Sequence, residues 1–190
     1  MDYKTCLQIF KITDITFLPI AAMKLVLAPK EERNPVYREL LKANNFDVSK
    51  DWFQEIYEGE LSEGKRKGQH FTPSGIHLLL SKLVEQPEKQ CQSVHEPTAG
   101  TGSLIIGDWW NEISKKMPWD VFPTQRTYTV WELSDRAVPL LLINLSIRGI
   151  NAIVYHGDVL EQTIIAKYAV VNKQNDSLGF SDIEVYNDVS

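Results

Sequence analysis

An acidic residue followed by two glycines marks a segment whose residue types suit the binding of a small molecule. Val94 and His95 lead into Glu96, and Gly100 and Gly102 follow shortly before a new apolar run. Glycine adopts backbone angles that other residues avoid, so a ligand can approach the main chain closely there. A helix beginning after Gly102 would add backbone N–H groups that lack an intrahelical partner. The pattern predicts a strand, a tight loop and a helix start that together cradle a ligand.

Two further acids each close an apolar, strand-like run. They are Glu132 and Asp158. An ionised carboxylate accepts hydrogen bonds at both oxygens, which suits the two hydroxyls of a ribose at Glu132 and an adenine amino group at Asp158. Leu133 and Val159 would then give the adenine apolar walls. Two structural alternatives stay open, in which Glu132 caps a helix and Asp158 belongs to a simple turn.

Two common phosphate-binding motifs are excluded. The dinucleotide fingerprint needs a third glycine at position 105, where this chain has Ile105. The P-loop needs Gly-Lys followed by Ser or Thr, and no such tripeptide occurs in the sequence. The glycine segment therefore does not fit either of these nucleotide-phosphate classes.

The order of four short motifs resembles a known family. Residues 68–73, Gly-Gln-His-Phe-Thr-Pro, and residues 96–103 are similar to the first two motifs of the S-adenosylmethionine-dependent adenine-N6 DNA methyltransferases, specifically the modification subunit of type I restriction systems. An acid and a Gly-Asp pair follow in the family's order. The resemblance implies S-adenosylmethionine as the cofactor, with Phe71 and Thr72 near its methionine carboxylate and Thr98 in the main cofactor loop. Thr72 as a helix cap and Phe71 as a core residue is the alternative.

The same resemblance points to Asn172 as the catalytic residue. In the family, an Asn-Pro-Pro-Tyr/Phe motif ends the fourth strand, where it holds the target amino group and stacks on the flipped-out base. In this chain only Asn172 is in place, without the prolines or the aromatic residue. Three functions therefore remain: a DNA adenine-N6 methyltransferase, an inactive cofactor-binding relative of phage or mobile-element type that acts on a restriction-modification partner, or a scaffold without a ligand.

Strand-like runs alternate with helical segments after residue 90, which favours parallel strands. We therefore expect an α/β fold, a Rossmann-like class I methyltransferase three-layer sandwich shortened at its C-terminus. The ligand is expected at the carboxyl ends of the strands, where the strand order reverses. Apolar residues at helical spacing predict a helical N-terminal extension over residues 1–60, followed by an S-adenosylmethionine-binding domain over residues 61–190.

Composition limits the partners and the compartment. A net charge of −5 favours contact with DNA through a partner subunit, and an uncovered sheet edge would favour a homodimer or a protein complex. Two cysteines without C-x-x-C spacing and four scattered histidines predict a reduced, cytoplasmic setting and no metal site. The apolar run at 15–23 contains Pro19 and is too short to span a membrane.

Overall fold

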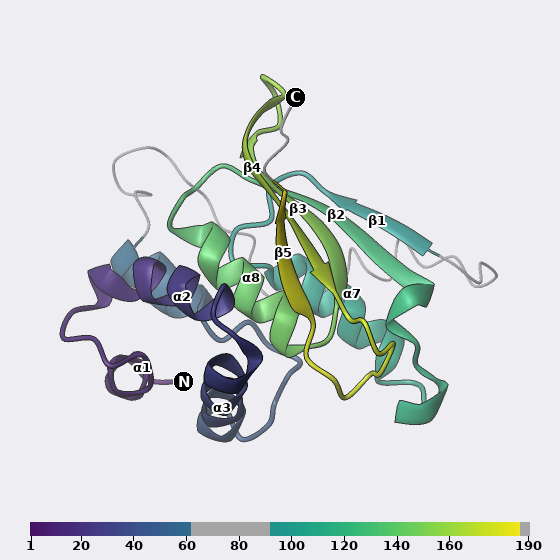
Figure 1. The fold of residues 1–190 in the computed structure, drawn as a ribbon, viewed down its shortest axis with the longest axis horizontal. Helices are drawn as coiled ribbons and strands as arrows, with labels where there is room; N and C mark the ends of the chain where they lie inside the picture. Colours follow the sequence, from purple (N-terminus) through teal and green to yellow (C-terminus); the bar gives the residue numbers. More distant parts are fainter. Residues whose placement is uncertain (62–91, 187–190) are drawn as a thin grey trace.

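The computed structural model describes residues 1–61 and 92–186 (Figure 1). Its centre is a sheet of five strands in the spatial order β1-β2-β3-β4-β5. The strands are β1 (Gln92–Glu96), β2 (Arg126–Glu132), β3 (Asn151–Asp158), β4 (Thr163–Val171) and β5 (Asp182–Tyr186). The helices around it are α1 (Tyr3–Phe10), α2 (Leu18–Val26), α3 (Lys30–Ala43), α4 (Gln54–Ile56), α7 (Ser103–Ile113) and α8 (Ala137–Ile147). Short turns of other helix types are η1 (Ile15–Phe17), η2 (Tyr57–Leu61), η3 (Pro118–Asp120) and η4 (Pro123–Gln125).

The first three strands are parallel, as the sequence predicts. Helix α7 connects β1 to β2, and α8 connects β2 to β3. Glu96 pairs with Val130, and Glu132 pairs with His156. This βαβαβ arrangement confirms the α/β, Rossmann-like class, and it brings the carboxyl ends of all three strands to one edge of the sheet.

The last two strands correct the expected topology. β4 pairs antiparallel with β3, and β5 pairs antiparallel with β4. Only residues 159–162 separate β3 from β4, and a parallel return would need a crossover of a dozen or more residues. The expectation of a parallel fourth strand is therefore wrong. In the described sheet the strand order also runs in one direction, so the expected reversal of strand order does not occur within it.

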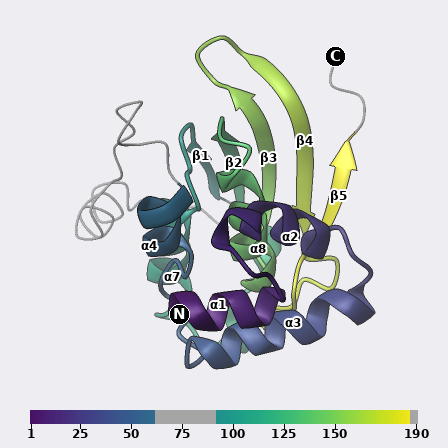
Figure 2. The ribbon, with the colours of Figure 1, turned by 90° about the vertical axis from the view of Figure 1, so that its left-hand side faces the viewer.

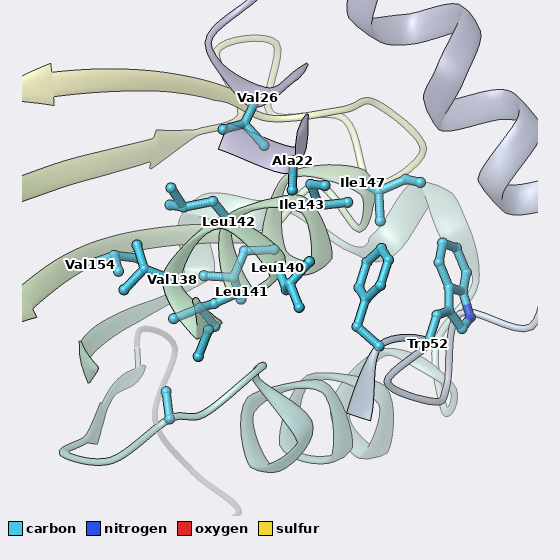
Figure 3. Packing of buried hydrophobic residues seen from close by; sticks show 14 of the residues in the cluster. Ala22, Val26, Trp52, Val138, Leu140, Leu141, Leu142, Ile143, Ile147 and Val154 are labelled. Carbon is cyan, nitrogen blue, oxygen red and sulfur yellow. The ribbon is translucent and has the colours of Figure 1, made fainter. Parts of the chain in front are cut away.

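Helix α8 forms the centre of the core. All of its residues are buried, because its apolar side chains occupy every side of the helix. One side packs on the sheet near Val154, and another faces Ala22 and Val26 of α2 (Figure 3). Pro139 lies in the first turn, where its missing N–H costs no helical hydrogen bond. A helix of this kind is stable only between two layers that both cover it.

The N-terminal helices supply the layer beyond α8. Figure 2 shows α2 in front of α8, with α1 and α3 below them and the sheet behind. The hydrophobic core includes Cys6, Leu18 and Tyr57 from the first 60 residues together with Val130 and Val154 from the sheet. Described residues on both sides of the predicted boundary at residue 60 therefore share one core.

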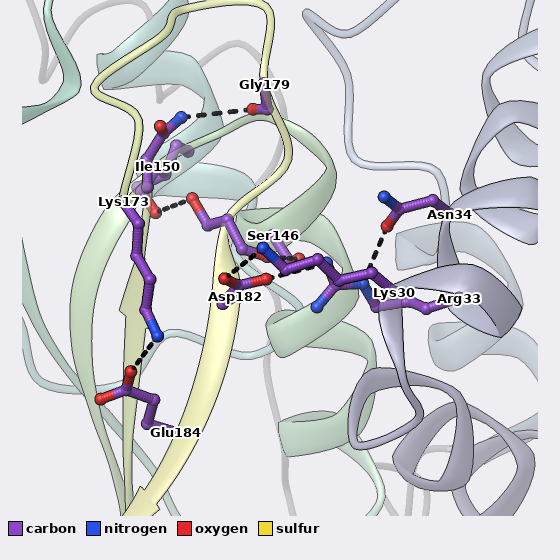
Figure 4. Close-up of polar contacts among 11 residues, drawn as sticks. Lys30, Arg33, Asn34, Ser146, Ile150, Lys173, Gly179, Asp182 and Glu184 are labelled. Atoms are coloured by element: carbon purple, nitrogen blue, oxygen red, sulfur yellow. Dashed lines mark hydrogen bonds and ion pairs between the residues drawn. The ribbon is translucent and has the colours of Figure 1, made fainter.

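The N-terminal layer also contacts the last strand. Arg33 is 3% exposed, and its Nη2 lies 3.1 Å from Oδ1 of Asp182 at the start of β5 (Figure 4). Lys30 contacts the other oxygen of the same carboxylate at 2.9 Å. Burial raises the pKa of Asp182, but hydrogen bonds and charges from Lys30 and Arg33 outweigh burial and leave this pKa below its ordinary value. Farther along β5, Lys173 pairs with Glu184 at 2.7 Å.

Candidate functional site

The glycine loop has the backbone conformation that its sequence predicts. Gly100 and Gly102 have φ angles of +58° and +103°, in the left-handed region that favours glycine. A Cβ atom on Gly102 would lie 2.9 Å from Cδ1 of Leu141, whereas one on Gly100 would meet nothing within 4 Å. The loop therefore packs closely on α8 at Gly102 and leaves open space beside the main chain at Gly100. Helix α7 begins directly after it at Ser103.

Glu132 connects this loop to the loop that follows β2. Its Oε2 accepts a hydrogen bond from the Gly100 N–H at 2.6 Å, and its Oε1 accepts one from the Ser134 N–H at 2.7 Å. The side chain is 8% exposed. Each oxygen of an ionised carboxylate can accept a second hydrogen bond. Glu132 can therefore hold both loops in place and still accept hydrogen bonds from a diol.

Glu96 and Asp158 lie at the same edge as Glu132, at the carboxyl ends of β1 and β3. Oε1 of Glu96 accepts the N–H of Thr98 at 3.0 Å. Oδ1 of Asp158 accepts the N–H of Leu160 at 2.8 Å, while no hydrogen bond to its Oδ2 comes from the described residues. Three carboxylates therefore line one edge, and Asp158 retains acceptor capacity there.

The remaining predicted cofactor residues are placed in part. Leu133 is 58% exposed, Val159 is half-buried and Thr98 is exposed, all at this carboxyl edge. Phe71 and Thr72 lie outside the described residues. The structure thus brings Glu96, Thr98, Gly100, Gly102, Glu132, Leu133, Asp158 and Val159 to one edge of the sheet, and their role in binding a cofactor stays a prediction.

Asn172 does not lie at this edge. Because β4 is antiparallel, its end lies at the edge where β3 begins, and the predicted placement of Asn172 beside the cofactor is wrong. The side chain is 4% exposed, and its Nδ2 donates to the carbonyl oxygens of Asp176, Gly149 and Gly179 at 2.7, 3.3 and 3.3 Å. Its backbone N–H donates to Oδ1 of Asn151 at 2.6 Å. Asn172 therefore fixes the loop before β5 onto the start of β3.

This placement gives a first testable prediction. Asn172→Ala should lower the free energy of unfolding by about 2 kcal/mol, because it leaves buried carbonyl groups without a donor. The affinity for S-adenosylmethionine should not change. Urea unfolding and calorimetric titration measure the two effects, and the exposed neighbour Gln174→Ala serves as the control. A loss of affinity at unchanged stability would contradict this structural role.

Asp51, which sequence analysis did not select, supports the glycine loop. Its Oδ2 accepts hydrogen bonds from the hydroxyls of Thr101 and Ser103 at 2.6 and 2.7 Å. Its Oδ1 accepts the side-chain amide of Asn144 at 2.8 Å. The backbone N–H groups of Phe53 and Gln54 also donate to Oδ1. One carboxylate therefore joins the N-terminal region, the glycine loop and α8.

Two further residue groups connect the N-terminal region to the rest of the site. Arg148 is 3% exposed, donates to the backbone carbonyl of Val48 at 2.8 Å, and lies 4.7 Å from the centre of the Trp52 ring. Burial lowers the pKa of Arg148 to about 10, against the opposing effect of the Asp51 charge. The hydroxyls of Tyr57 and Ser134 are 2.9 Å apart, so the N-terminal region also contacts the loop after β2.

A cavity of about 530 Å³ lies at the other edge of the sheet, where β2 and β3 begin. Trp109 and Phe122 contribute aromatic walls, and Arg126 and Tyr128 contribute polar groups. Asp108 accepts hydrogen bonds from both Arg126 and Tyr128, and burial raises the pKa of Tyr128 well above its ordinary value. This cavity is separate from the carboxylate edge.

A comparison with protein families identifies the family of this chain. The model of the family described as N-6 DNA methylase matches residues 48–176. The chain belongs to the N-6 DNA methylase family. The region matched to this family begins before Asp51 and includes the described parts of the glycine loop, β2, β3 and β4. The resemblance to adenine-N6 DNA methyltransferases that the sequence motifs indicate is thereby confirmed.

A solved structure is also similar to this N-6 DNA methylase family member. It comes from Listeria monocytogenes and is described as a candidate class I S-adenosylmethionine-dependent methyltransferase. The two chains are 15% identical, with a TM-score of 0.48, and the alignment covers 86% of this chain and 56% of the other. The present chain thus spans just over half the length of that protein.

The described residues were also compared with the requirements of a metal site and of a membrane-spanning helix. Within residues 1–61 and 92–186, no three side chains of His, Cys, Asp or Glu are grouped so that they could hold a metal ion. Among the helices that the structure describes, none is both long enough and apolar enough to cross a membrane.

Proposed function

We propose that this N-6 DNA methylase family member binds S-adenosylmethionine at the carboxyl edge of β1, β2 and β3 and serves in adenine-N6 methylation of DNA. The observation that carries the proposal is the Glu132 carboxylate, which holds the N–H groups of Gly100 and Ser134 and keeps acceptor capacity at the edge. Open space beside Gly100 supports close approach of a ligand to the main chain. These residues fit a nucleoside cofactor.

Each residue has a specific role in the proposal. Glu132 accepts the ribose hydroxyls, Asp158 accepts the adenine amino group through its free oxygen, and Leu133 and Val159 cover the adenine ring. Bound S-adenosylmethionine supplies a methyl group on a sulfonium, which is a good leaving group. The chain's own contribution is therefore orientation rather than acid–base chemistry.

The target base is proposed to depend on a partner subunit, in the manner of type I restriction-modification assemblies. Asn172 lies at the opposite edge and its amide is fully engaged. Holding a base outside its stack requires hydrogen bonds and stacking. A net charge of −5 also favours DNA contact through a partner over independent binding.

Calorimetric titration of S-adenosylmethionine into the full chain tests the cofactor site. We expect micromolar binding that competes with S-adenosylhomocysteine. Glu132→Gln and Asp158→Asn should each weaken binding about 10- to 100-fold, the scale of a lost hydrogen bond to a charged group. Glu161→Gln, an exposed acid near Asp158, is the matched control. The absence of both heat and competition for the parent protein would exclude this function.

A second candidate is a catalytically inactive relative that binds a restriction-modification or other protein partner. The position of Asn172 favours it, because the residue expected to orient the target amino group is remote from the carboxylate edge. Both candidates predict that the purified chain alone transfers no radiolabelled methyl groups to unmethylated DNA. Sustained turnover by the chain alone would contradict both the inactive assignment and the need for a partner.

A further inference from the structure

His156 is a polar residue at the carboxyl edge that has no role in the cofactor site as proposed above. It pairs with Glu132 of β2 on one side and with Ala166 of β4 on the other. Because Glu132 is the last residue of β2, His156 lies level with the carboxylate that is proposed to hold the ribose. Asp158 follows two residues later on β3, about 7 Å farther along the strand. His156 is therefore a neighbour of both acids.

The side chain of His156 belongs to the face of the sheet that α8 covers. Successive residues of a strand point to opposite faces of a sheet. Val154 belongs to the core, and His156 comes two residues after it on β3, so the two share a face. Tyr155 lies between them and points the other way, where its ring stacks on Trp131. His156 thus shares its face with Glu132, which is 8% exposed.

The Nε2 atom of His156 is buried without a hydrogen-bond partner among residues 1–61 and 92–186. The residue as a whole is half-buried, so one side of the ring lies in the interior and another side faces solvent. Buried polar atoms in native proteins are nearly always hydrogen-bonded, and leaving one unpaired costs free energy. An imidazole kept in this position indicates a function beyond packing.

The buried nitrogen determines where the ring carries its proton. A neutral imidazole has one N–H donor and one acceptor nitrogen. For buried backbone groups, an orphaned N–H is rarer than an under-satisfied acceptor, and the same preference places the histidine proton on Nδ1. No residue in the described part of the chain forms a hydrogen bond with Nδ1 either. His156 therefore offers an N–H donor beside Glu132 and Asp158, whose ionised carboxylates are acceptors only.

We propose that Nδ1 of His156 donates a hydrogen bond to a ring nitrogen of the cofactor's adenine, either N1 or N3, and so contributes to adenine specificity. The inference rests on the proposed S-adenosylmethionine site. The amino group and the ribose lie at the two ends of the adenine edge that carries N1 and N3. Asp158 accepts from the amino group and Glu132 from the ribose, so a donor next to both acids matches the acceptor atoms between them. Two carboxylates alone would not require an acceptor on the ring.

Calorimetric titration of the full chain with S-adenosylhomocysteine and with its 1-deaza and 3-deaza analogues tests the proposal. Each analogue has a C–H group in place of one ring nitrogen and therefore lacks one acceptor. The parent protein should bind one of the two analogues about 10-fold more weakly than S-adenosylhomocysteine, the scale of one lost hydrogen bond. Its affinity for the other analogue should be nearly unchanged, which identifies the nitrogen that His156 contacts.

Variants of His156 assign the effect to this residue. His156→Phe keeps a planar ring but lacks the donor, so it should bind S-adenosylhomocysteine about 10-fold more weakly than the parent and no longer distinguish the sensitive analogue. His156→Asn places an amide N–H near the position of Nδ1 and should restore most of the affinity, which a purely structural role would not predict. His95→Phe is the matched control, because His95 is an exposed histidine on β1.

The outcomes distinguish this inference from the proposed function. Equal affinity of the parent for all three ligands, or parental affinity in His156→Phe, overturns the inference and leaves the cofactor site standing. Discrimination between the analogues that persists in His156→Phe assigns the contact to another donor and also overturns it. No binding of S-adenosylhomocysteine by the parent overturns the proposed function and this inference together. If His156→Phe does not fold by circular dichroism, His156→Gln replaces it, because its amide lies nearer the position of Nε2.

Discussion

Asp51→Ala should lower the free energy of unfolding by about 3 to 5 kcal/mol, the scale observed when one partner of a buried polar network is removed. The Asp51 carboxylate accepts hydrogen bonds from Thr101, Ser103 and Asn144. Its removal leaves the Thr101 hydroxyl without this acceptor, takes one of two acceptors from Ser103 and from Asn144, and deprives the buried Arg148 of its stabilising negative charge. Chemical unfolding followed by circular dichroism measures the loss.

The control for Asp51 is its neighbour Asp47. Asp47 also accepts hydrogen bonds, from Ser49, and pairs with Lys50, but its side chain is 42% exposed. Water can replace these contacts, so Asp47→Ala should cost less than about 1 kcal/mol. Equal losses in the two variants would show that Asp51 acts only as a local turn residue. We also expect Asp51→Ala to weaken S-adenosylmethionine binding, because Thr101 and Ser103 belong to the glycine loop and its helix start.

Gly157→Ala is the second substitution with a large expected effect. A Cβ atom on Gly157 would lie 2.0 Å from the carbonyl oxygen of Thr163 and 3.0 Å from Cα of Ile164. These are backbone atoms of the paired strand at the register shift between β3 and β4, so no side-chain movement can relieve the overlap. We expect a loss of about 3 kcal/mol or more in the free energy of unfolding, the upper range for overpacking.

Gly59→Ala provides the control for this glycine. A Cβ atom on Gly59 would meet nothing within 4 Å, so the unfolding free energy should stay within about 0.5 kcal/mol or rise slightly. Thermal and urea unfolding compare the two variants. A Gly157→Ala variant whose free energy of unfolding equals that of the parent protein would contradict the expected overlap. Because Asp158 follows Gly157 directly, the affinity for S-adenosylmethionine should fall as well.

The sequence predicts the part of the fold that contains β1, β2, β3 and the helices between them. There the alternation of strand-like and helical runs corresponds to the observed parallel connections. The bounds of α7, Ser103–Ile113, follow from the glycines before it and the apolar run within it. The acids at the ends of β1, β2 and β3 reach one edge because short βαβ units make parallel strands. The placement of Glu96, Glu132 and Asp158 at one edge could therefore be predicted from residue types and spacing.

Other features depend on information that spacing does not contain. The prediction for Asn172 relied on the order of the family's motifs along the chain. The short connection at 159–162 already required β4 to be antiparallel to β3. Asp51 precedes Gln54 by three residues, which indicates a helix cap, but its contacts with Thr101 and Asn144 join residues 50 and 93 positions apart. The apolar composition of α8 predicts burial, yet it does not identify α2 as the second covering layer.

The burial of α8 on all sides has a consequence for how the chain folds. Before the sheet and the N-terminal helices have assembled, residues 137–147 expose apolar side chains in every direction. Neither layer alone can cover them, so assembly of both layers around α8 must belong to one cooperative transition. The contact of Arg33 with Asp182, 149 residues later, adds a slow, long-range step. Until both layers are in place, this segment exposes apolar surface of the kind that makes partly folded chains prone to aggregate.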